Sequence, residues 1–352
     1  MLIIKRILSG LVILVLLFPW PACAYGEESA DFLSARSAVL MWNGEVLFEK
    51  NSRQKLPMAS TTKLMTALLT AERCRMEERV RIDASDCRVE GSSMELRGEE
   101  EKSIGELLKG LLLVSGNDAA LALARHVGGS EEAFVRLMNE KAAALSMNST
   151  HFTNPHGLTD ENHFSTAADL ALLMRACLEN ETLRSIMALK SCVVDGKTLI
   201  NHNRLLYQCK GCTGGKTGYT EAAGRCLVSS CQREGAELVC VTLNAPDDWN
   251  DHRKLYDKAF REYSLRSVTD GLRFSSPVVG GTEELVYLVA PEERSVFCRK
   301  EAKVEVTAKL PWFLFAPIEK GESAGRAIIT VDGRTVGEYP LVCRDSIITE
   351  KS

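Results

Sequence analysis

Ser60 and Lys63 are spaced so that a hydroxyl and an amine can share one face of a helix. They lie in the stretch LPMASTTKLMTALLT, where apolar residues begin to recur at helical intervals. A serine hydroxyl becomes a strong nucleophile only when a base takes its proton, and a lysine can be that base when burial or a nearby cation lowers its pKa. The pair therefore indicates covalent catalysis by a serine. Because Ser-x-x-Lys also occurs at ordinary helix starts, the pair alone does not decide between the two interpretations.

Two other segments, 115–117 (Ser-Gly-Asn) and 216–218 (Lys-Thr-Gly), could contribute to such chemistry. The first lies between two helical patterns, where Ser and Asn also serve as caps. The second lies in GCTGGKTGYT, which is also consistent with a glycine-rich turn before a strand. The phosphate-loop pattern Gly-x-x-x-x-Gly-Lys-Ser/Thr fails, because it requires a glycine where the chain has Lys210. The three segments together could supply a nucleophile, a base and a second cation.

The elements that must position these segments are a helical cluster and an antiparallel sheet. Two strand-like runs in 35–50 flank Asn43-Gly44, the preferred dipeptide of a type I′ turn, and predict a β-hairpin. Apolar periodicity predicts a helix from about Ser60 and further helices between about 103 and 189, one of them capped by Ser165. The remaining predicted elements are strands over 214–220, 225–230 and 237–243 and a closing helix over 251–263.

The last part of the chain has a different pattern. Beyond about Ser267, apolar and polar residues alternate, and Asp332-Gly333 is a second hairpin signal. We therefore predict an α/β (α+β) domain over 25–267, with an antiparallel sheet and a helical cluster. A small all-β, sandwich-like domain is predicted over 268–352.

Residues 1–24 predict a secretory signal peptide, and so an exported, extracytoplasmic protein. Lys5 and Arg6 precede an apolar run, and Ala22-Cys23-Ala24 offers small residues at a cleavage site. An uncleaved anchor and a lipoprotein attached through Cys23 are the alternatives. The net charge is −4, and it becomes −6 when Lys5 and Arg6 are removed. Such an acidic balance disfavours nucleic acid and anionic lipid as partners.

The chain has 12 cysteines, of which 11 remain once Cys23 is removed with the signal. Several lie inside apolar runs, which favours buried thiols. Cys209 and Cys212 form the one suggestive pair, for which a local disulfide or a metal site is the alternative. A zinc site would need a second matched pair. We predict neither a metal site nor a cofactor.

Taken in order, Ser-x-x-Lys, Ser-x-Asn and Lys-Thr-Gly match the motif set of penicillin-binding proteins and serine β-lactamases. Longer blocks resemble one family among them, the D-alanyl-D-alanine carboxypeptidases, low-molecular-mass penicillin-binding proteins that trim peptidoglycan. The blocks are LPMASTTKLMTALLT, LLLVSGNDAALALA, FTNPHGLTDENHFSTAADLALL, GGKTGYTEAAGRCLV and LNAPDDWNDHRKLYDKAF. The resemblance covers about 33–265 well and the β domain more loosely. It implies the penicillin-binding transpeptidase/β-lactamase-like fold, a stem-peptide substrate ending in D-Ala-D-Ala, and β-lactam antibiotics as covalent inhibitors.

The resemblance also implies a role for each catalytic position. Ser60 would attack the carbonyl between the two D-alanines and form an acyl-enzyme, while Lys63 takes its proton. Ser115 would relay a proton to the leaving D-alanine through a hydrogen-bond chain Lys63–Ser115–Lys216. The backbone N–H groups of Ser60 and Tyr219 would form the oxyanion hole. A water would then release the acyl group.

The same resemblance implies the residues that bind substrate. Asn117 would hold a substrate amide. Lys216 would help keep the base neutral and, with the Thr217 hydroxyl, would attract the terminal carboxylate. Gly214, Gly215 and Gly218 would leave room for the peptide to lie along this strand as an added strand. Tyr219 completes the binding segment.

The sequence departs from the family pattern in two places. Some members carry an arginine after the Lys-Thr-Gly strand that grips the carboxylate, and the stretch 244–249 has none. Arg253 follows it, in a helical setting that favours a solvated face. Many members end in an amphipathic helix on the membrane, which RDSIITEKS does not form, so membrane association stays open. His156 and His163 lie in a loop, where a surface role is favoured over a part in deacylation.

Three other functions are compatible with the motifs. A serine β-lactamase shares all three, but we find no Glu-x-x-x-Asn near 154–164 to supply the deacylating glutamate of the class A enzymes. A non-catalytic wall-binding protein could keep the fold without turnover, although drift would be expected to break at least one motif. A transpeptidase would differ only in the acceptor that attacks the acyl-enzyme.

Overall fold

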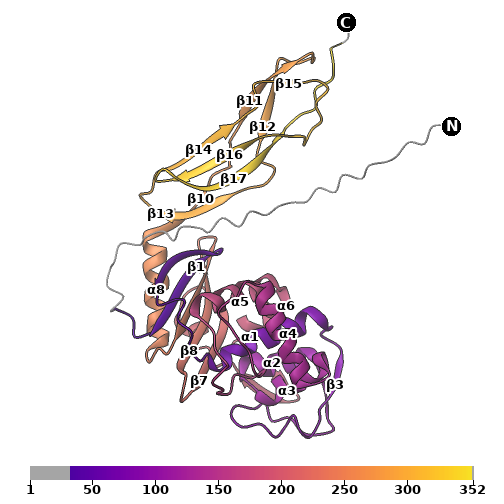
Figure 1. Cartoon of the computed structure of the whole chain (residues 1–352), viewed down its shortest axis with the longest axis vertical. Helices are drawn as coiled ribbons and strands as arrows, with labels where there is room; N and C mark the ends of the chain where they lie inside the picture. Colours follow the sequence, from indigo (N-terminus) through magenta and orange to yellow (C-terminus); the bar gives the residue numbers. More distant parts are fainter. Residues whose placement is uncertain (1–31, 351–352) are drawn as a thin grey trace, which may run out of the picture.

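The computed structural model describes residues 32–350, and the predicted signal peptide at 1–24 lies outside this range. A mixed domain of helices and sheet is followed by a separate region of β-structure, which appears at the top of Figure 1. The predicted fold class is confirmed: an α+β core with an antiparallel sheet and a helical cluster, and an all-β domain toward the C-terminus.

The sheet of the mixed domain has five strands in the order β2-β1-β9-β8-β7, and every neighbouring pair is antiparallel. Its strands are β1 (Ser37–Trp42), β2 (Glu45–Lys50), β7 (Cys212–Thr220), β8 (Gly224–Arg233) and β9 (Ala236–Leu243). The predicted hairpin joins β1 to β2, with φ of 44° at Asn43 and 88° at Gly44. β7, which carries the Lys-Thr-Gly segment, is an edge strand.

Helices cover both faces of this sheet, as Figure 1 shows. Those of the helical cluster are α1 (Lys63–Arg73), α2 (Ile104–Leu113), α3 (Asn117–Gly128), α4 (Glu131–Ala144), α5 (Ala167–Glu179) and α6 (Glu181–Ala188). The opposite face is covered chiefly by α8 (Asp248–Glu262), with α7 (Leu205–Gln208) nearby. The short pairs β3 (Arg79–Arg81) with β4 (Glu101–Ser103) and β5 (Ser191–Val194) with β6 (Lys197–Ile200) lie outside the main sheet.

Alternation along β8 divides the interior of this domain into two cores. Cys226 and Val228 belong to the core that contains the helical cluster, whereas Leu227 belongs to the core that contains α8. Residues directly opposite each other on neighbouring strands point to the same face. Lys216, which pairs with Val228, therefore faces the helical cluster, and Thr217, which pairs with Leu227, faces α8.

Several local predictions need correction. α5 is capped by Thr166 and not by Ser165, because the Thr166 side chain accepts the N–H of Asp169. The hydroxyl of Ser165 is instead paired with Thr150. α8 begins at Asp248, three residues before the predicted start at 251, because the stretch after β9 turns directly into the helix. The short strand pairs β3–β4 and β5–β6 were not foreseen, since segments of three or four residues carry little periodicity.

After α8, the described chain up to residue 350 forms strands and no further helix. β10 (Tyr263–Ser267) follows α8 directly and pairs with β13 (Ser295–Arg299). The six-stranded sheet contains β14 (Val304–Lys309), β16 (Ser323–Val331), β17 (Arg334–Cys343), β12 (Leu285–Val289), β11 (Phe274–Val279) and β15 (Leu314–Phe315), in that order. The predicted Asp332-Gly333 turn joins β16 to β17. Among the described residues, no helix is both long and apolar enough to cross a membrane.

Candidate active site

Ser60 lies in the 3₁₀ turn η2 (Ala59–Thr62), and Lys63 is the first residue of α1. Ser60 is partly exposed, whereas Lys63 is fully buried. The Nζ atom of Lys63 lies 2.9 Å from the Ser60 Oγ. The predicted helical spacing therefore brings the hydroxyl and the amine into direct contact.

Two carbonyl oxygens complete the surroundings of the Lys63 amine. Its Nζ donates to the side-chain Oδ1 of Asn117 at 2.6 Å and to the backbone carbonyl of His156 at 2.6 Å. Asn117 is held in turn by donation from its Nδ2 to the carbonyl of Glu90 at 2.6 Å. The amine is thus fixed by three segments that are far apart in the sequence.

Ser115 and Lys216 form the second contact pair of the site. The Nζ of Lys216 donates to the Ser115 Oγ at 3.0 Å and to the carbonyl of Thr217 at 2.7 Å. Ser115 has φ of 63°, in the left-handed region, at the break between α2 and α3. No hydrogen bond between described residues joins Ser115 to Lys63. Of the expected chain Lys63–Ser115–Lys216, the structure therefore shows only the second link.

Burial without a bonded carboxylate shifts both lysine pKa values downward. Desolvation lowers the pKa of Lys63 well below its ordinary value; the positive charge of Lys216 lowers it further, while Asp118 opposes the shift. Desolvation also lowers the pKa of Lys216, to about 7. Two cations are therefore disfavoured in this site, and one of the two amines is expected to be neutral.

Gly218 allows β7 to approach η2 closely. A Cβ atom at this position would lie 3.0 Å from the backbone nitrogen of Ser60 and 3.1 Å from the carbonyl of Met58. The neighbouring binding positions on β7 are open: Thr217 is half-buried and Tyr219 is 68% exposed. The Thr217 hydroxyl has no hydrogen-bond partner among residues 32–350.

Gly157 allows a second close approach that the sequence did not reveal. It has φ of 90°, and a Cβ atom there would lie 2.1 Å from the carbonyl of Ala59. This contact places the loop at 154–158 against η2, so that the His156 carbonyl reaches Lys63. The sequence indicated a loop here, but not the element against which the loop packs.

The His156 and His163 side chains are buried, which corrects the expected surface role. Desolvation lowers the pKa of His156 to about 3 and that of His163 to about 4, so both rings are neutral at pH 7. The Nδ1 of His163 accepts the N–H of Thr153 at 3.0 Å, and its Nε2 lies 2.7 Å from the Thr62 hydroxyl. The His163 ring therefore holds the loop to η2.

Arg253, the arginine nearest to the stretch 244–249 in the helix that follows, is bonded within its own helix. Its Nη2 donates to the side chain of Asn250, and its Nε is buried without a partner in the described part of the chain. The expected fully solvated face is therefore wrong, because the side chain is half-buried.

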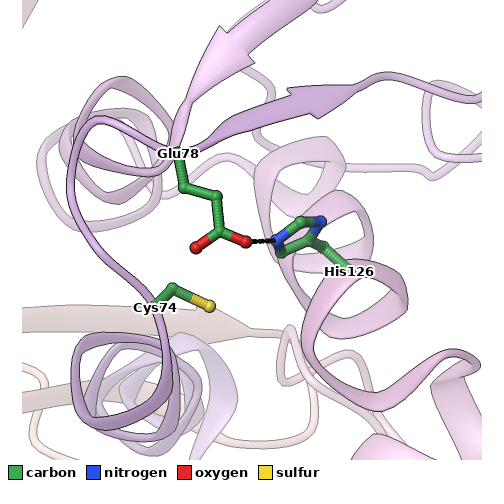
Figure 2. Close-up of side chains that lie close together, drawn as sticks. All are labelled: Cys74, Glu78 and His126. Carbon is green, nitrogen blue, oxygen red and sulfur yellow. Dashed lines mark hydrogen bonds and ion pairs between the residues drawn. The ribbon is translucent and has the colours of Figure 1, made fainter.

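Cys74, Glu78 and His126 are the one described set of three side chains close enough to hold a metal ion, and Figure 2 shows them pointing toward one another. Their donor atoms lie within 4.8 Å of each other, and sulfur, nitrogen and carboxylate ligands would suit zinc. However, Glu78 already accepts a hydrogen bond from His126 at 2.9 Å, and all three side chains are partly exposed. The geometry is that of a partly exposed hydrogen bond between a histidine and a glutamate, beside a thiol.

All the cysteines that the structure describes are free thiols. Cys212 is directly opposite Cys231 on the β7–β8 pair. Hydrogen bonding to Cys231 and Arg233 lowers the pKa of Cys209 to about 7. Cys209, Cys212 and Cys231 lie on the α8 side of the sheet, opposite the face on which Lys216 contacts Ser115.

Comparisons with known proteins agree with this geometry. Residues 25–247 match the model of the D-alanyl-D-alanine carboxypeptidase family, and residues 272–348 match that of the penicillin-binding protein 5 C-terminal domain. The chain is 32% identical to D-alanyl-D-alanine carboxypeptidase DacF of Bacillus subtilis, over 97% of this chain and 95% of that protein. It is also 32% identical to DacC of Escherichia coli, over 98% and 92% of the two chains.

Solved structures show the same fold. Penicillin-binding protein 5 of Haemophilus influenzae aligns with a TM-score of 0.76 and 27% identity, over 90% of this chain and 98% of that one. A peptidoglycan synthesis regulatory factor (PBP3) of Streptococcus pneumoniae aligns with a TM-score of 0.78 and 25% identity, over 90% and 99%. The family model spans more than half of the chain, and the relatives cover nearly all of it. The protein belongs to the D-alanyl-D-alanine carboxypeptidase family.

Proposed function

We propose that this protein, a serine-type D-Ala-D-Ala carboxypeptidase by family, removes the terminal D-alanine of peptidoglycan stem peptides through an acyl-enzyme on Ser60, with Lys63 as the base. The observation that carries this proposal is the set of three contacts around the Lys63 amine. A neutral amine has two N–H donors and one lone pair. The carbonyl oxygens of Asn117 and His156 occupy the two donors, so the lone pair is directed at the Ser60 hydroxyl, 2.9 Å away.

The start of η2 and the edge of β7 would together form the oxyanion hole. The close approach of Gly218 brings the β7 backbone to the Ser60 nitrogen. We assign the two donors to the backbone N–H groups of Ser60 and Tyr219, and each such donor typically contributes about 2.7–4 kcal/mol to transition-state stabilisation. Because β7 is an edge strand, a peptide can add beside it and place its scissile carbonyl at these donors.

Proton transfer to the leaving group is assigned to Ser115. Its hydroxyl receives a hydrogen bond from Lys216, so it can pass its own proton toward the departing D-alanine nitrogen while Lys216 supports the oxygen. Lys63 would resupply Ser115 once the substrate has displaced the side chains slightly, since their present hydrogen bonds do not connect them. Water would then attack the acyl-enzyme, with Lys63 again as the base.

Substrate binding is assigned to Asn117 and to the β7 segment. Within the protein, the Asn117 Nδ2 donates one hydrogen bond and its Oδ1 accepts one. One N–H donor and one lone pair are therefore left for a substrate amide. Lys216, Thr217 and Gly218 would lie beside the terminal D-alanine. The free Thr217 hydroxyl is suited to its carboxylate.

The cellular setting follows from the substrate. We propose that residues 1–24 are a signal peptide that exports the protein to the cell envelope, where it acts in peptidoglycan biosynthesis, cell-wall biogenesis and cell shape. The catalytic domain is assigned to 25–267 and the C-terminal β domain to 268–352. β-Lactam antibiotics would acylate Ser60, because they present a strained amide to the same groups.

The decisive experiment measures D-alanine release from a pentapeptide ending in D-Ala-D-Ala. Wild-type protein should release D-alanine and be labelled covalently by a fluorescent penicillin, and Ser60→Ala should lose both. Ser185→Ala is the control, since among residues 32–350 this exposed hydroxyl bonds only the Thr182 carbonyl within α6. Release that persists in Ser60→Ala would show that another nucleophile is used.

The same assay separates the alternative functions. Rapid destruction of penicillin with many turnovers would establish a β-lactamase. Transfer of the acyl group to an added amine in preference to water would establish a transpeptidase. Absence of both release and labelling in the wild type would leave a wall-binding protein without catalysis.

A further inference from the structure

A carboxypeptidase needs a cation near the terminal carboxylate of its substrate, and the stretch 244–249 supplies none. Lys216 is only 1% exposed, and its amine already donates to Ser115 and to the Thr217 carbonyl. Arg253 is tied to Asn250 within α8. The Thr217 hydroxyl alone carries no charge. A further cation, partly exposed and next to Thr217, would supply the missing positive charge.

We infer that Arg225 is the cation that receives the terminal carboxylate of the substrate, beside the Thr217 hydroxyl, and that Asp248 and Trp249 hold it in place. This inference rests on the proposed carboxypeptidase function and names the group that gives it specificity for a free C-terminus. Arg225 would be a substrate-binding residue, and the other two would be positioning residues.

The β7–β8 register places Arg225 beside the proposed carboxylate site. Tyr219 is directly opposite Arg225, and Thr217 is directly opposite Leu227, two residues further along the same strand. All four side chains therefore share the α8 face of the sheet. Arg225 is the diagonal neighbour of Thr217, and such neighbours are about 7–8 Å apart, which an arginine side chain can span.

The guanidinium of Arg225 is fixed by a buried carboxylate. Its Nε and Nη2 donate to the Oδ1 of Asp248 at 3.0 and 2.7 Å. The Asp248 side chain is 3% exposed, whereas that of Arg225 is 40% exposed. The Trp249 ring lies 5.4 Å from the Arg225 Cζ and limits its rotation. A cation that is held on one side and open to solvent on the other is preorganised for an incoming anion.

The unused hydrogen-bonding capacity of Arg225 matches this role. A guanidinium has five N–H donors. Only Nε and Nη2 have partners among residues 32–350, so both Nη1 hydrogens are available. Asp248 and Trp249 come from the stretch 244–249 that lacks an arginine. In this chain, the stretch therefore anchors a cation from the neighbouring strand instead of providing its own.

Arg233 provides a matched control for a purely structural role. It lies on the same strand and the same face, eight residues from Arg225. It also pairs with an aspartate of α8, since its Nη1 donates to Asp257 at 2.8 Å, and its Cζ lies 5.0 Å from the Phe260 ring. It lies at the opposite end of the strand from the Lys-Thr-Gly segment. Loss of the ion pair should lower stability when either arginine is replaced. Weaker carboxylate recognition should appear only when Arg225 is replaced.

The test compares two thioester substrates with the same acyl group, one ending in a free carboxylate and one ending in the corresponding carboxamide. Thioester loss is followed for wild type, Arg225→Gln, Arg225→Lys and Arg233→Gln, with thermal unfolding as a stability control. For Arg225→Gln we expect kcat/KM on the carboxylate substrate to fall about 10- to 100-fold, the range of a charge-assisted hydrogen bond. The carboxamide substrate should change less than about threefold, and Arg225→Lys should recover part of the loss.

The outcomes separate this inference from the proposed function. If wild type is inactive on both substrates and on D-Ala-D-Ala peptide, the proposed function itself is wrong. If wild type is active but Arg225→Gln keeps the full preference for the carboxylate, Arg225 does not bind it. If Arg225→Gln and Arg233→Gln lower the rates on both substrates equally, the arginine is only structural, and the inference is overturned.

Discussion

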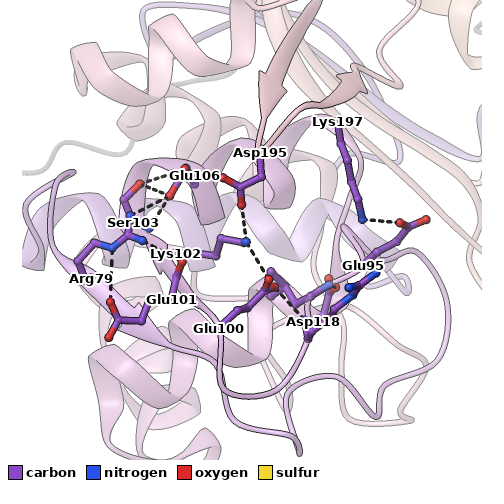
Figure 3. A network of polar contacts seen from close by, with 12 residues as sticks. Arg79, Glu95, Glu100, Glu101, Lys102, Ser103, Glu106, Asp118, Asp195 and Lys197 are labelled. Atoms are coloured by element: carbon purple, nitrogen blue, oxygen red, sulfur yellow. Dashed lines mark hydrogen bonds and ion pairs between the residues drawn. The ribbon is translucent and has the colours of Figure 1, made fainter.

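Two groups of lysines in this molecule have opposite environments. The active-site lysines Lys63 and Lys216 are buried, and their hydrogen bonds go to hydroxyl and carbonyl oxygens. In the network of Figure 3, Lys102 contacts the carboxylates of Glu100 and Asp195, and Lys197 contacts that of Glu95. The same residue type is therefore surrounded by neutral oxygens in one region and by charged oxygens in the other.

The difference decides what each lysine can do. Partial burial lowers the pKa of Lys102, but hydrogen bonds to Asp195 and Glu100 outweigh this effect, and its pKa is raised. Lys102 therefore stays a cation and can serve only as an ion-pair partner. Neutral acceptors give Lys63 hydrogen bonds without stabilising its charge, so its pKa falls and it can accept a proton. The groups that contact Lys63 directly are neutral oxygens and not carboxylates. They therefore orient the amine and also leave it able to act as a base.

Asp118 connects the two regions. Its buried carboxylate accepts the N–H groups of Met94 and Leu96 and the Ser93 hydroxyl, and it also accepts the N–H of Ala119. It directly follows Asn117, which contacts Lys63. Its charge raises the pKa of Lys63, against burial and Lys216, but does not reverse the shift. A carboxylate can therefore lie next to the active site without reversing the downward shift of the Lys63 pKa.

The largest effect is expected for Lys63→Met. The variant has no base at this position, so acylation of Ser60 by penicillin should slow by about 10³- to 10⁴-fold. Stability should fall by about 1–3 kcal/mol, because the buried carbonyl oxygens of Asn117 and His156 lose their hydrogen-bond donor. The measurements are stopped-flow acylation and thermal unfolding. Normal acylation in a folded variant would rule out Lys63 as the base.

Lys216→Met should change the pH dependence of stability as well as activity. Between about pH 7 and 10.5, residue 216 holds a proton in the unfolded chain but not in the folded one, so raising the pH favours the fold of the wild type. Removing the amine should reduce the increase in unfolding temperature that the wild type shows as the pH rises. Turnover of D-Ala-D-Ala peptide should fall about 100-fold. An unchanged stability profile would mean that Lys216 titrates near its ordinary value.

Asp118→Asn should have an intermediate effect and would sharpen the comparison. The amide cannot accept all four hydrogen bonds, so unfolding free energy should fall by about 2 kcal/mol. Removing the negative charge also removes the one contribution that raises the pKa of Lys63. The acid limb of the acylation rate should therefore shift to lower pH, which a pH–rate profile measures. A shift to higher pH would contradict the assigned electrostatics.

The sequence predicted the parts of this site that depend on local spacing. The contact between Ser60 and Lys63 follows from a single helical turn, and the place of Lys216 on a strand of the antiparallel sheet follows from the strand pattern. The meeting of the three segments was expected from family resemblance, since no periodicity reports which loops touch. The fold class was predicted correctly because long helices and alternating strands carry strong signals.

What the sequence did not predict depends on backbone atoms and on packing between distant segments. The His156 carbonyl contacts Lys63, whereas only the side chain of His156 had been considered. The close approach of Gly157 to Ala59 requires knowledge of both partners. The caps and contacts of Ser165 and Arg253 were misjudged for the same reason: each side chain had several possible partners, and tertiary structure selected among them.

Lys102→Met should have the smallest effect, because it removes a cation from the paired network and not from the active site. The loss of its contacts to the partly exposed carboxylates of Glu100 and Asp195 should lower unfolding free energy by about 1 kcal/mol, and added salt should shrink the difference. Acylation and D-alanine release should be unchanged. If Lys102→Met slows acylation as much as Lys63→Met, the presence of carboxylate partners does not distinguish structural lysines from catalytic ones. Parallel acylation assays and salt-dependent unfolding of the two variants decide the matter.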